Sequence, residues 1–242
     1  MNKMTAGNIG KFYAVGVGPG DPDLLTRKAY QVLSEVEIIW APIARTSDQS
    51  YSLNIVGQAI DLNNKQIVES SFPTDDEAGA LAVWEQSAGE IIQYLNQGQN
   101  VAFITEGDPM IYSTVSYVLE VIQNQCPEAE VEIIPGVSSV MAAASSAGIP
   151  LVRHGQKLAI LPYVYGIDDL REAISNYDTI VLMKVNKLLL TALANLEQLG
   201  LLGKTTYVRR ASTDNERIVQ NLADLTEQDL DYFSLLIIRK GE

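Results

Sequence analysis

Short apolar runs alternate along most of the chain with longer segments whose apolar residues recur at helical spacing. Runs of β-branched, aromatic and other apolar residues predict buried strands at residues 11–15, 36–41, 100–105, 131–134, 158–161, 178–184, 205–209 and 233–238. Amphipathic spacing predicts helices within residues 24–36, 53–60, 81–95, 115–122, 142–144, 188–196 and 218–225. The second strand is expected to end at Pro42, with loops at residues 45–49 and 73–79. This alternation predicts an α/β fold.

The two halves of the chain differ in how their predicted strands are separated. In the first half strands and helices alternate, which favours a mostly parallel sheet. In the second half only the short helical pattern of residues 218–225 separates the last two strands, and we expect a mixed sheet there. We therefore expect two α/β domains, residues 1–135 and 136–242. A cleft between such domains is the default place for a ligand.

The most informative loop has the sequence Gly-Val-Gly-Pro-Gly-Asp-Pro, at residues 16–22. It joins a predicted strand to a predicted helix, with Asp21 at the N-cap and Pro22 at the first helical position. The loop matches neither the dinucleotide fingerprint nor the phosphate loop. Pro19 removes a backbone N–H and Asp21 adds negative charge, so the loop suits a neutral or cationic ligand without phosphates. The alternative is a tight strand-to-helix turn in which Asp21 is only a cap.

Two further loops repeat this arrangement of a strand, small residues and a helix. Residues 106–112 contain Gly107, then Asp108 as a helix cap, then Pro109 at the first helical position. Residues 135–139 follow the next predicted strand and carry two hydroxyl side chains. The carboxyl ends of parallel strands meet at one edge of a sheet, where open α/β sheets bind ligands. The three loops are therefore expected to share a site, the alternative for Asp108 being a plain N-cap.

Composition and charge exclude several classes of function. The chain has 242 residues and a formal net charge of −13, which argues against a nucleic-acid surface. The single cysteine, Cys126, fits a reducing cytosol; with only one histidine, His154, a structural zinc site is excluded and no metal centre is expected. No signal peptide or membrane span is predicted, so we expect a cytoplasmic protein without membrane contacts. One histidine and no Gly-x-Ser-x-Gly motif also disfavour a hydrolase triad.

Taken together, these motifs resemble those of the tetrapyrrole methylases, a family that uses S-adenosylmethionine. The resemblance covers nearly the whole chain, with its most specific motifs at residues 16–22, 107–109, 135–139 and 181–184. The likeness to members that methylate C20 of precorrin-2 or cobalt-factor-2 in cobalamin biosynthesis lies at residues 105–114, 182–185, 214–219 and 232–237. The resemblance implies a C-methyltransferase of this kind and leaves open whether the ring already holds cobalt.

The resemblance also implies a two-domain homodimer with the cofactor folded into the interdomain cleft. By position, the family's cofactor contacts fall on Pro19, Glu106, Gly107, Asp108, Ile111, Tyr112, Ser138, Ser139, Met183 and Ala211. Ala211 departs from the glycine that several relatives have there, and Glu106 stands where some members have a second glycine. Core packing at the end of a strand is the alternative role for Met183.

A tetrapyrrole of this type carries many carboxylates, whereas the chain is strongly acidic. Local basic side chains are therefore expected at the mouth of the cleft. The expected substrate-binding residues are Arg45, Arg153, Lys184 and Arg210, together with Asp21 from the first loop. Asp108 and Tyr112 are the expected catalytic residues, as groups that help the ring to lose a proton. Methyl transfer is a displacement at carbon that needs no metal, so positioning supplies much of the rate.

Three alternatives keep some of these observations. Other relatives of the same fold methylate diphthamide precursors or ribosomal RNA, although the acidic charge disfavours RNA. A dinucleotide oxidoreductase requires the fingerprint that the first loop lacks. A non-catalytic binding module would hold the cofactor without releasing its methyl group. We rank these three behind the tetrapyrrole methyltransferase.

Overall fold

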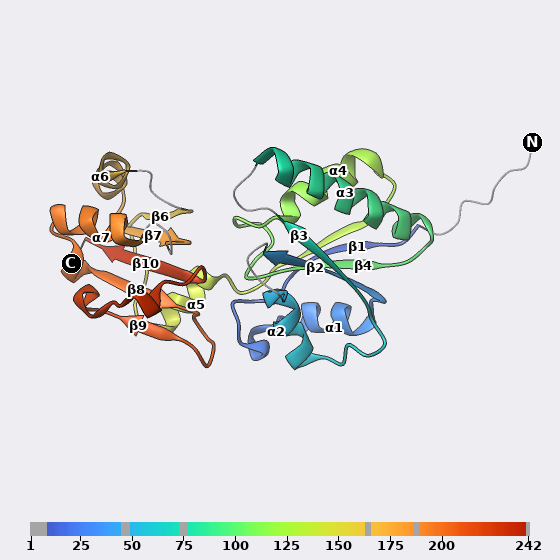
Figure 1. Cartoon of the computed structure of the whole chain (residues 1–242), viewed down its shortest axis with the longest axis horizontal. Coiled ribbons are helices and arrows are strands. Elements are labelled where there is room, and N and C mark those ends of the chain that lie inside the picture. Colours follow the sequence, from blue (N-terminus) through green and yellow to red (C-terminus); the bar gives the residue numbers. More distant parts are fainter. Residues whose placement is uncertain (1–8, 45–48, 73–76, 163–165, 186–188, 241–242) are drawn as a thin grey trace, which may run out of the picture. The chain divides into compact units, whose positions relative to one another are not determined.

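The computed structural model describes residues 9–44, 49–72, 77–162, 166–185 and 189–240. They form two compact units, which divide between Ser138 and Ser139 (Figure 1). The sequence predicts this boundary between residues 135 and 136. Within the described ranges, no helix is both long and apolar enough to span a membrane.

The first unit is a five-stranded parallel sheet covered by helices on both faces (Figure 1). Its strands, in spatial order, are β3 (Gln66–Phe72), β2 (Ile38–Ala44), β4 (Val101–Thr105), β1 (Phe12–Gly16) and β5 (Val131–Ile134). Its helices are α1 (Arg27–Glu35), α2 (Tyr51–Ala59), α3 (Glu77–Asn96) and α4 (Val115–Gln125). All the strand pairs are parallel, so the prediction for the N-terminal sheet is confirmed.

Successive side chains of the central strands point to opposite faces of the sheet, and each face is covered by a layer of helices. Phe12 and Phe103 pack with α3 and α4, whereas Val15 and Ile104 pack with α1 and α2 (Figure 1). All four are fully buried, because a central parallel strand has a helical layer on each face. With both faces covered, the loops at the carboxyl edge are where a ligand can reach the sheet.

Two predicted helix starts are wrong in the same way. Asp21 caps only a single 3-10 turn, Pro22–Leu24, and helix α1 begins at Arg27. Helix α4 likewise begins at Val115 and not beside Pro109. In each loop the aspartate side chain accepts a hydrogen bond from the N–H two residues further on. The Gly-Asp-Pro pattern therefore specifies a local turn at the end of the strand, and the helix follows later.

Strand β2 differs from its prediction because it continues through Pro42 to Ala44. In the described structure β4 pairs with β2 only as far as Trp40, whereas β3 pairs along the whole strand. Beyond Trp40, β2 therefore makes no strand hydrogen bonds to β4. Pro42, which has no N–H to donate, is tolerated at such a position. Strand β3 itself was not predicted, because its alternating polar residues give a weak apolar signal.

The second unit is built on a mixed five-stranded sheet. Its strands, in spatial order, are β6 (Leu158–Leu161), β7 (Thr179–Met183), β10 (Ser234–Arg239), β8 (Thr205–Arg209) and β9 (Arg217–Val219). Strands β6 and β7 are parallel, whereas β10 runs antiparallel to both β7 and β8. Its helices are α5 (Ser139–Ser146), α6 (Ile167–Asn176) and α7 (Leu189–Gln198). The prediction of a mixed C-terminal sheet is therefore confirmed.

The predicted helix over residues 218–225 is wrong. The segment forms the short strand β9 and then a 3-10 turn, Leu222–Asp224. The helical spacing of Ile218, Leu222 and Leu225 is therefore not that of one helical face: Ile218 lies in β9, Leu222 is buried in the turn, and Leu225 follows the turn and packs partly against the core. Short apolar patterns of this kind do not distinguish a helix from a strand that ends in a turn. Helix α6 was not predicted.

Candidate functional site

The loops that follow β1 and β4 are joined backbone to backbone. The N–H of Gly107 donates to the carbonyl of Gly18 at 2.8 Å, and the N–H of Gly18 donates to the carbonyl of Gly107 at 3.3 Å. Both residues have positive φ, 80° at Gly18 and 67° at Gly107, a conformation that glycine adopts without steric cost. The two glycine loops therefore form one rigid corner at the carboxyl edge of the first sheet.

The loop after β5 joins the same corner through two contacts. The N–H of Gly136 donates to Oδ2 of Asp108 at 3.1 Å. A Cβ on Gly136 would lie 2.0 Å from the Gly107 carbonyl oxygen and 2.8 Å from the carbonyl carbon of Gly16. Only glycine fits, because the three backbones touch there. The structure thus brings the three predicted loops together, while their role as ligand contacts stays a prediction.

The hydrogen bonds within this corner leave few backbone N–H groups that could bind an anion. The N–H groups of Gly18, Gly107 and Gly136 are all donated within the corner, and Pro19 has no N–H. A phosphate site needs such N–H groups directed at the ligand. The carbonyl oxygens of Gly18 and Gly107 and both carboxylate oxygens of Asp108 also accept hydrogen bonds here, and Asp108 adds negative charge. These features disfavour a phosphate, and the neutral or cationic ligand that the sequence predicts stays a prediction.

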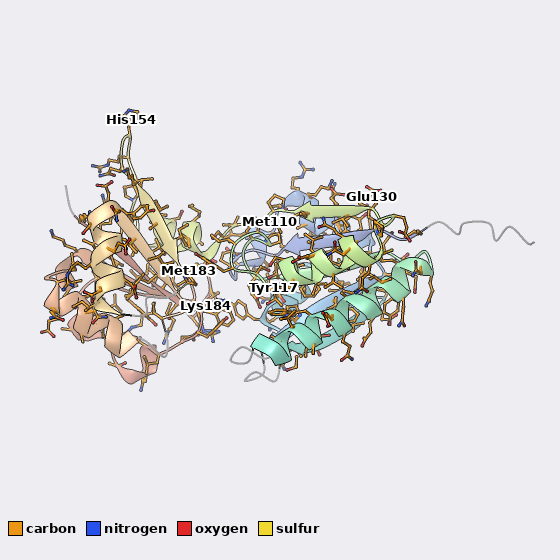
Figure 2. All side chains as sticks on the ribbon, turned by 90° about the horizontal axis from the view of Figure 1, so that it is seen from above. Met110, Tyr117, Glu130, His154, Met183 and Lys184 are labelled. Atoms are coloured by element: carbon orange, nitrogen blue, oxygen red, sulfur yellow. The ribbon has the colours of Figure 1, made fainter. Side chains whose placement is uncertain are left out.

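The segment after Asp108 carries the predicted residues Ile111 and Tyr112. Tyr112 has a φ of 51°, unusual for a non-glycine residue, and 47% of it is exposed. The neighbouring Met110 is 54% exposed, and Figure 2 shows it at the end of the first unit opposite Glu130, which directly precedes β5. Tyr112 therefore lies in an accessible loop at the carboxyl end of the sheet.

Ser113 holds this loop in place, although the sequence does not predict it as a site residue. Its hydroxyl lies 2.9 Å from that of Thr105, at the end of β4, and accepts from the N–H of Val115 at 3.3 Å. This links the strand end to the first residue of α4 and fixes the loop between them. A serine two residues before an apolar helix is the signal that would have identified it.

Other predicted residues lie in the loops of this corner or directly after them in the chain. Pro19 is buried, and its carbonyl accepts from the Tyr51 hydroxyl at 3.4 Å. Glu106 and Ser138 are half-buried in the loops after β4 and β5. Ser139 begins α5, which belongs to the second unit. Arg45 lies outside the described residues.

In the second unit, four of the predicted residues gather at one edge of the sheet: Met183, Lys184, Arg210 and Ala211. Met183 ends β7, and the N–H of Lys184 donates to the carbonyl of Ser234 at 3.1 Å. Arg210 follows β8, and its N–H donates to the carbonyl of Phe233 at 2.8 Å. Because β10 runs antiparallel to β7 and β8, its first residues lie beside the last residues of both. Ala211 is buried next to Arg210.

Backbone conformation distinguishes this edge further. Among the described residues, the non-glycine residues with positive φ are Tyr112, Lys184, Arg210 and Ser212. Three of them lie at this edge, and Tyr112 belongs to the corner of the first unit. Ser212 is held by its N–H, which donates to Oε2 of Glu216 at 2.6 Å. Such residues persist only where surrounding contacts fix them, and they concentrate at functional sites.

The side chains of this edge form an aromatic and charged cluster. Nε of Arg210 donates to Oδ2 of Asp231 at 2.6 Å, and the guanidinium carbon lies 5.5 Å from the Phe233 ring centre. The Lys184 ammonium lies 5.4 Å from the ring centre of Tyr232. The two rings meet edge to face at 5.3 Å. We call Lys184, Arg210, Asp231, Tyr232 and Phe233 the edge cluster.

Arg153 does not join this cluster. It precedes β6 by a few residues, and the N–H of Lys157, at the start of that strand, donates to Oδ2 of Asp178 at 2.7 Å. This places the segment beside the start of β7, whereas Lys184 follows the end of β7. Figure 2 shows the neighbouring His154 at the far end of the unit from Met183 and Lys184. The structure therefore separates Arg153 from the other predicted substrate residues of this unit.

Comparisons with known proteins relate nearly the whole chain to one family. A model of the tetrapyrrole (corrin/porphyrin) methylases matches residues 11–226. The probable cobalt-precorrin-2 C(20)-methyltransferase of Methanocaldococcus jannaschii is 36% identical over 99% of this chain and 99% of its own. The cobalt-precorrin-2 C(20)-methyltransferase of Salmonella typhimurium is 34% identical over 96% of this chain and 97% of its own.

Solved structures share the fold. A cobalt precorrin-4 methyltransferase has a TM-score of 0.73 at 21% identity and covers 95% of this chain and 94% of its own. The uroporphyrin-III C-methyltransferase of Thermus thermophilus, crystallised with S-adenosylhomocysteine, has a TM-score of 0.65 at 25% identity, covering 96% of this chain and 98% of its own. The family model and the full-length relatives together show that the chain belongs to the tetrapyrrole methylase family.

Proposed function

We propose that this protein is an S-adenosylmethionine-dependent methyltransferase that methylates C20 of a precorrin-2-type tetrapyrrole in cobalamin biosynthesis. The observation that carries the proposal is full-length similarity, at 36% and 34% identity, to two proteins named for this reaction on cobalt-precorrin-2. The loops of the glycine corner lie on the motifs that carry the family resemblance, and so do Lys184, Tyr232 and Phe233 of the edge cluster. Full-length similarity to these two proteins does not favour the alternative acceptors, a diphthamide precursor or ribosomal RNA.

The glycine corner fits the cofactor chemically. S-adenosylmethionine supplies a methyl group on a positively charged sulfur and carries no phosphate. The N–H groups of Gly18, Gly107 and Gly136 are used within the corner, and Asp108 adds a negative charge, which suits a cation and the ammonium of an amino acid. We propose that the cofactor-binding residues are Pro19, Glu106, Gly107, Asp108, Ile111, Tyr112, Ser138, Ser139, Met183 and Ala211.

The edge cluster supports recognition of an acidic substrate. The chain carries a net charge of −13, so a polycarboxylate is repelled by most of its surface and must be met by a local group of basic side chains. Lys184 and Arg210 lie together at one sheet edge and are the basic residues we propose for the substrate. Asp21 keeps its place in the proposed set, and so does Arg45, which lies outside the described residues. The position of Arg153, beside the start of β7, does not support it.

The catalytic assignment follows from the hydrogen bonds already made. Both carboxylate oxygens of Asp108 accept from backbone N–H groups, those of Met110 and Gly136. This supports a positioning role, in which Asp108 holds two loops in register for the reacting groups. Tyr112 has an exposed side chain and remains the proposed group for proton removal from the ring. We also propose that the protein is cytoplasmic and forms a homodimer. Light scattering of the purified protein, which measures its molar mass, tests the dimer.

The decisive experiment supplies purified protein with carbon-13 methyl-labelled S-adenosylmethionine and either metal-free precorrin-2 or cobalt-factor-2. We expect the ring to gain one methyl group, located at C20 by nuclear magnetic resonance, with S-adenosylhomocysteine as the second product. A preference for metal-free precorrin-2 would mean that cobalt is inserted after this step, and a preference for cobalt-factor-2 would mean that it is inserted before. Transfer to neither ring, together with transfer to RNA or to a diphthamide precursor, would overturn the proposal.

A further inference from the structure

The two basic side chains of the edge cluster differ in how their charge is compensated. Arg210 donates from Nε to the Asp231 carboxylate at 2.6 Å, so its charge is already paired. For Lys184, no carboxylate among the described residues lies within ion-pair distance of the ammonium, whose partner is the ring of Tyr232 at 5.4 Å. An ammonium over an aromatic face still has N–H groups available for an anion.

We propose that Lys184 is the residue of this edge that binds a substrate carboxylate, and that Tyr232 positions its ammonium. In this arrangement the Arg210–Asp231 pair is a positioning element that holds the turn before β10. The inference rests on the proposed tetrapyrrole methylation and divides the roles of the two basic residues within it. It adds Tyr232 and Asp231 to the site as positioning residues.

The backbone at Lys184 supports a role for its side chain. Its φ of 57° is left-handed, a conformation in which glycine is favoured and a long side chain carries a steric cost. The N–H of Lys184 donates to the carbonyl of Ser234, which holds that conformation at the end of the strand pairing. Glycine adopts this conformation at lower cost, so the backbone alone does not account for a lysine here.

Asp231 builds the turn that presents Tyr232. Its Oδ1 accepts from the N–H of Phe233 at 2.8 Å, and its carbonyl accepts from the Ser234 hydroxyl at 2.6 Å. These bonds fix the residues on both sides of Tyr232, while the Phe233 ring packs edge to face against the Tyr232 ring. Tyr232 is 39% exposed, so its ring guides the lysine side chain and still leaves the ammonium open to a ligand. The conformational freedom of a long lysine is thereby reduced before the substrate binds.

The test measures binding and turnover separately. Binding is followed by absorbance titration with uroporphyrin, a stable porphyrin that carries many carboxylates, and with coproporphyrin, which carries fewer. Turnover is followed with the accepted tetrapyrrole, and cofactor binding by calorimetry with S-adenosylhomocysteine. Lys184→Gln removes the charge, Lys184→Gly also relieves the backbone, and Lys184→Arg restores a cation. Lys157→Gln is the matched control, because Lys157 lies at the opposite edge of the same sheet.

For Lys184→Gln and Lys184→Gly we expect the Kd for uroporphyrin and the KM for the tetrapyrrole to rise about 10- to 100-fold, the loss typical of a charged hydrogen bond. The Kd for S-adenosylhomocysteine should stay within about twofold of the original, and Lys184→Gly should melt no lower than the unmodified protein. Lys184→Arg should recover part of the affinity. Uroporphyrin should lose more affinity than coproporphyrin, and Lys157→Gln should change none of these values.

The positioning roles have their own variants. Tyr232→Leu should raise the KM for the tetrapyrrole about threefold to tenfold, the range of a cation–π contact, while Tyr232→Phe, which keeps the ring, should lose less. The double variant Arg210→Gly with Asp231→Asn removes both charges of the pair. It should lower the melting temperature but weaken uroporphyrin binding less than Lys184→Gln does.

The outcomes separate this inference from the proposed function. If the unmodified protein methylates the ring and Lys184→Gln matches its KM and Kd, the inference is wrong and the function stands. The same holds if the double variant loses as much affinity as Lys184→Gln. If the unmodified protein transfers no methyl group but binds uroporphyrin in a Lys184-dependent way, the carboxylate site stands and the function is wrong. Binding and transfer both absent would overturn the two together.

Discussion

The Asp108 carboxylate accepts a hydrogen bond from the N–H of Gly136 at 3.1 Å, and this bond spans the end of a strand that lies between them. Asp108 follows β4 and Gly136 follows β5, while β1 is placed between those two strands in the sheet. The other carboxylate oxygen accepts from the N–H of Met110 at 2.9 Å. One side chain thus crosses the carboxyl end of β1 and holds the loops after β4 and β5 together.

Replacing Asp108 with asparagine should weaken the first unit. An asparagine has one accepting oxygen, so its NH2 group must face either the Gly136 N–H or the Met110 N–H. The unpaired donor should lower the free energy of unfolding by about 1–2 kcal/mol. Urea unfolding followed by tryptophan fluorescence checks this, because Trp40 and Trp84 both lie in the first unit. Asp21→Asn is the control, since the hydrogen bond that Asp21 accepts from the N–H of Asp23 stays within its own turn. Equal losses in both variants would contradict the bridging role.

Gly136→Ala should be more damaging than Asp108→Asn. The added Cβ would lie 2.0 Å from the Gly107 carbonyl oxygen, so two backbones must separate. We expect a loss of about 3 kcal/mol in unfolding free energy, the upper range for overpacking, together with weaker binding of S-adenosylhomocysteine. Gly89→Ala provides the contrast: it lies within helix α3 with no atom in the way and should gain up to about 1 kcal/mol. A stable Gly136→Ala protein would show that the corner is not closely packed.

Sequence patterns predicted the central strands of both sheets, because each central strand has two buried faces and gives an uninterrupted apolar run. Strand β3 was not predicted, because polar residues interrupt its apolar ones and leave no continuous apolar run. The start of α4 was misjudged because the Asp108 turn and the helix cap use the same residue types. Local chemistry determines that a turn forms there, whereas tertiary contacts decide how far along the chain the helix begins.

The candidate site was predictable only where a motif follows a strand. The glycine corner and Lys184 are of this kind, since the ends of neighbouring strands must meet at one edge. The Asp231–Arg210 pair is not, because Arg210 follows β8 and Asp231 precedes β10, 21 residues later, and nothing local marks them as partners. Arg153 shows the converse: its basic character alone suggested it, and the structure places it away from the end of β7, where Lys184 lies.

Tyr112→Phe tests the proposed proton transfer directly. The substitution removes the hydroxyl and keeps the exposed ring and the loop conformation. We expect kcat to fall about 100-fold, the usual contribution of one acid–base group, while S-adenosylhomocysteine binds with similar affinity. Tyr117→Phe is a suitable control, because that ring stacks on Trp84 at 3.9 Å and lies in α4. An unchanged kcat in Tyr112→Phe would remove this residue from the catalytic proposal.

Cys126 should report unfolding of the first unit. The side chain is buried at the end of α4, and burial, with Glu128 nearby, raises the pKa of its thiol above the ordinary value. The thiol is therefore protonated and shielded at neutral pH, and thiol reagents should react only as the unit opens. The urea midpoint for labelling should match that of tryptophan fluorescence. Ser34→Cys adds an exposed thiol as the positive control; native labelling of Cys126 at that control's rate would contradict its burial.

Asp229 should make the second unit sensitive to acid. It is 1% exposed, lies 2.7 Å from Nε of Arg217, and accepts from both the N–H and the hydroxyl of Thr226. Burial acts to raise the pKa of this carboxyl, but the hydrogen bonds from Thr226 and the charges of Arg217 and Arg209 outweigh it, so the pKa is lowered overall. A folded-state pKa below the unfolded value contributes stability above the unfolded pKa of about 4, and that contribution is lost as pH falls through the folded value.

Asp229→Asn should therefore cost about 3 kcal/mol near neutral pH, because Arg217 is left beside a buried neutral group. As the pH falls from about 4 through the lower folded-state pKa of Asp229, the difference from the unmodified protein should shrink, because Asp229 becomes protonated and the two side chains are then both uncharged. Amide hydrogen exchange in β8, measured across this pH range, follows the second unit separately from the first. Asp224→Asn is the matched control, because Asp224 is exposed near the same arginine and should change little at any pH. A constant difference across the range would mean that the Asp229 charge does not stabilise the fold and that its loss acts through packing alone.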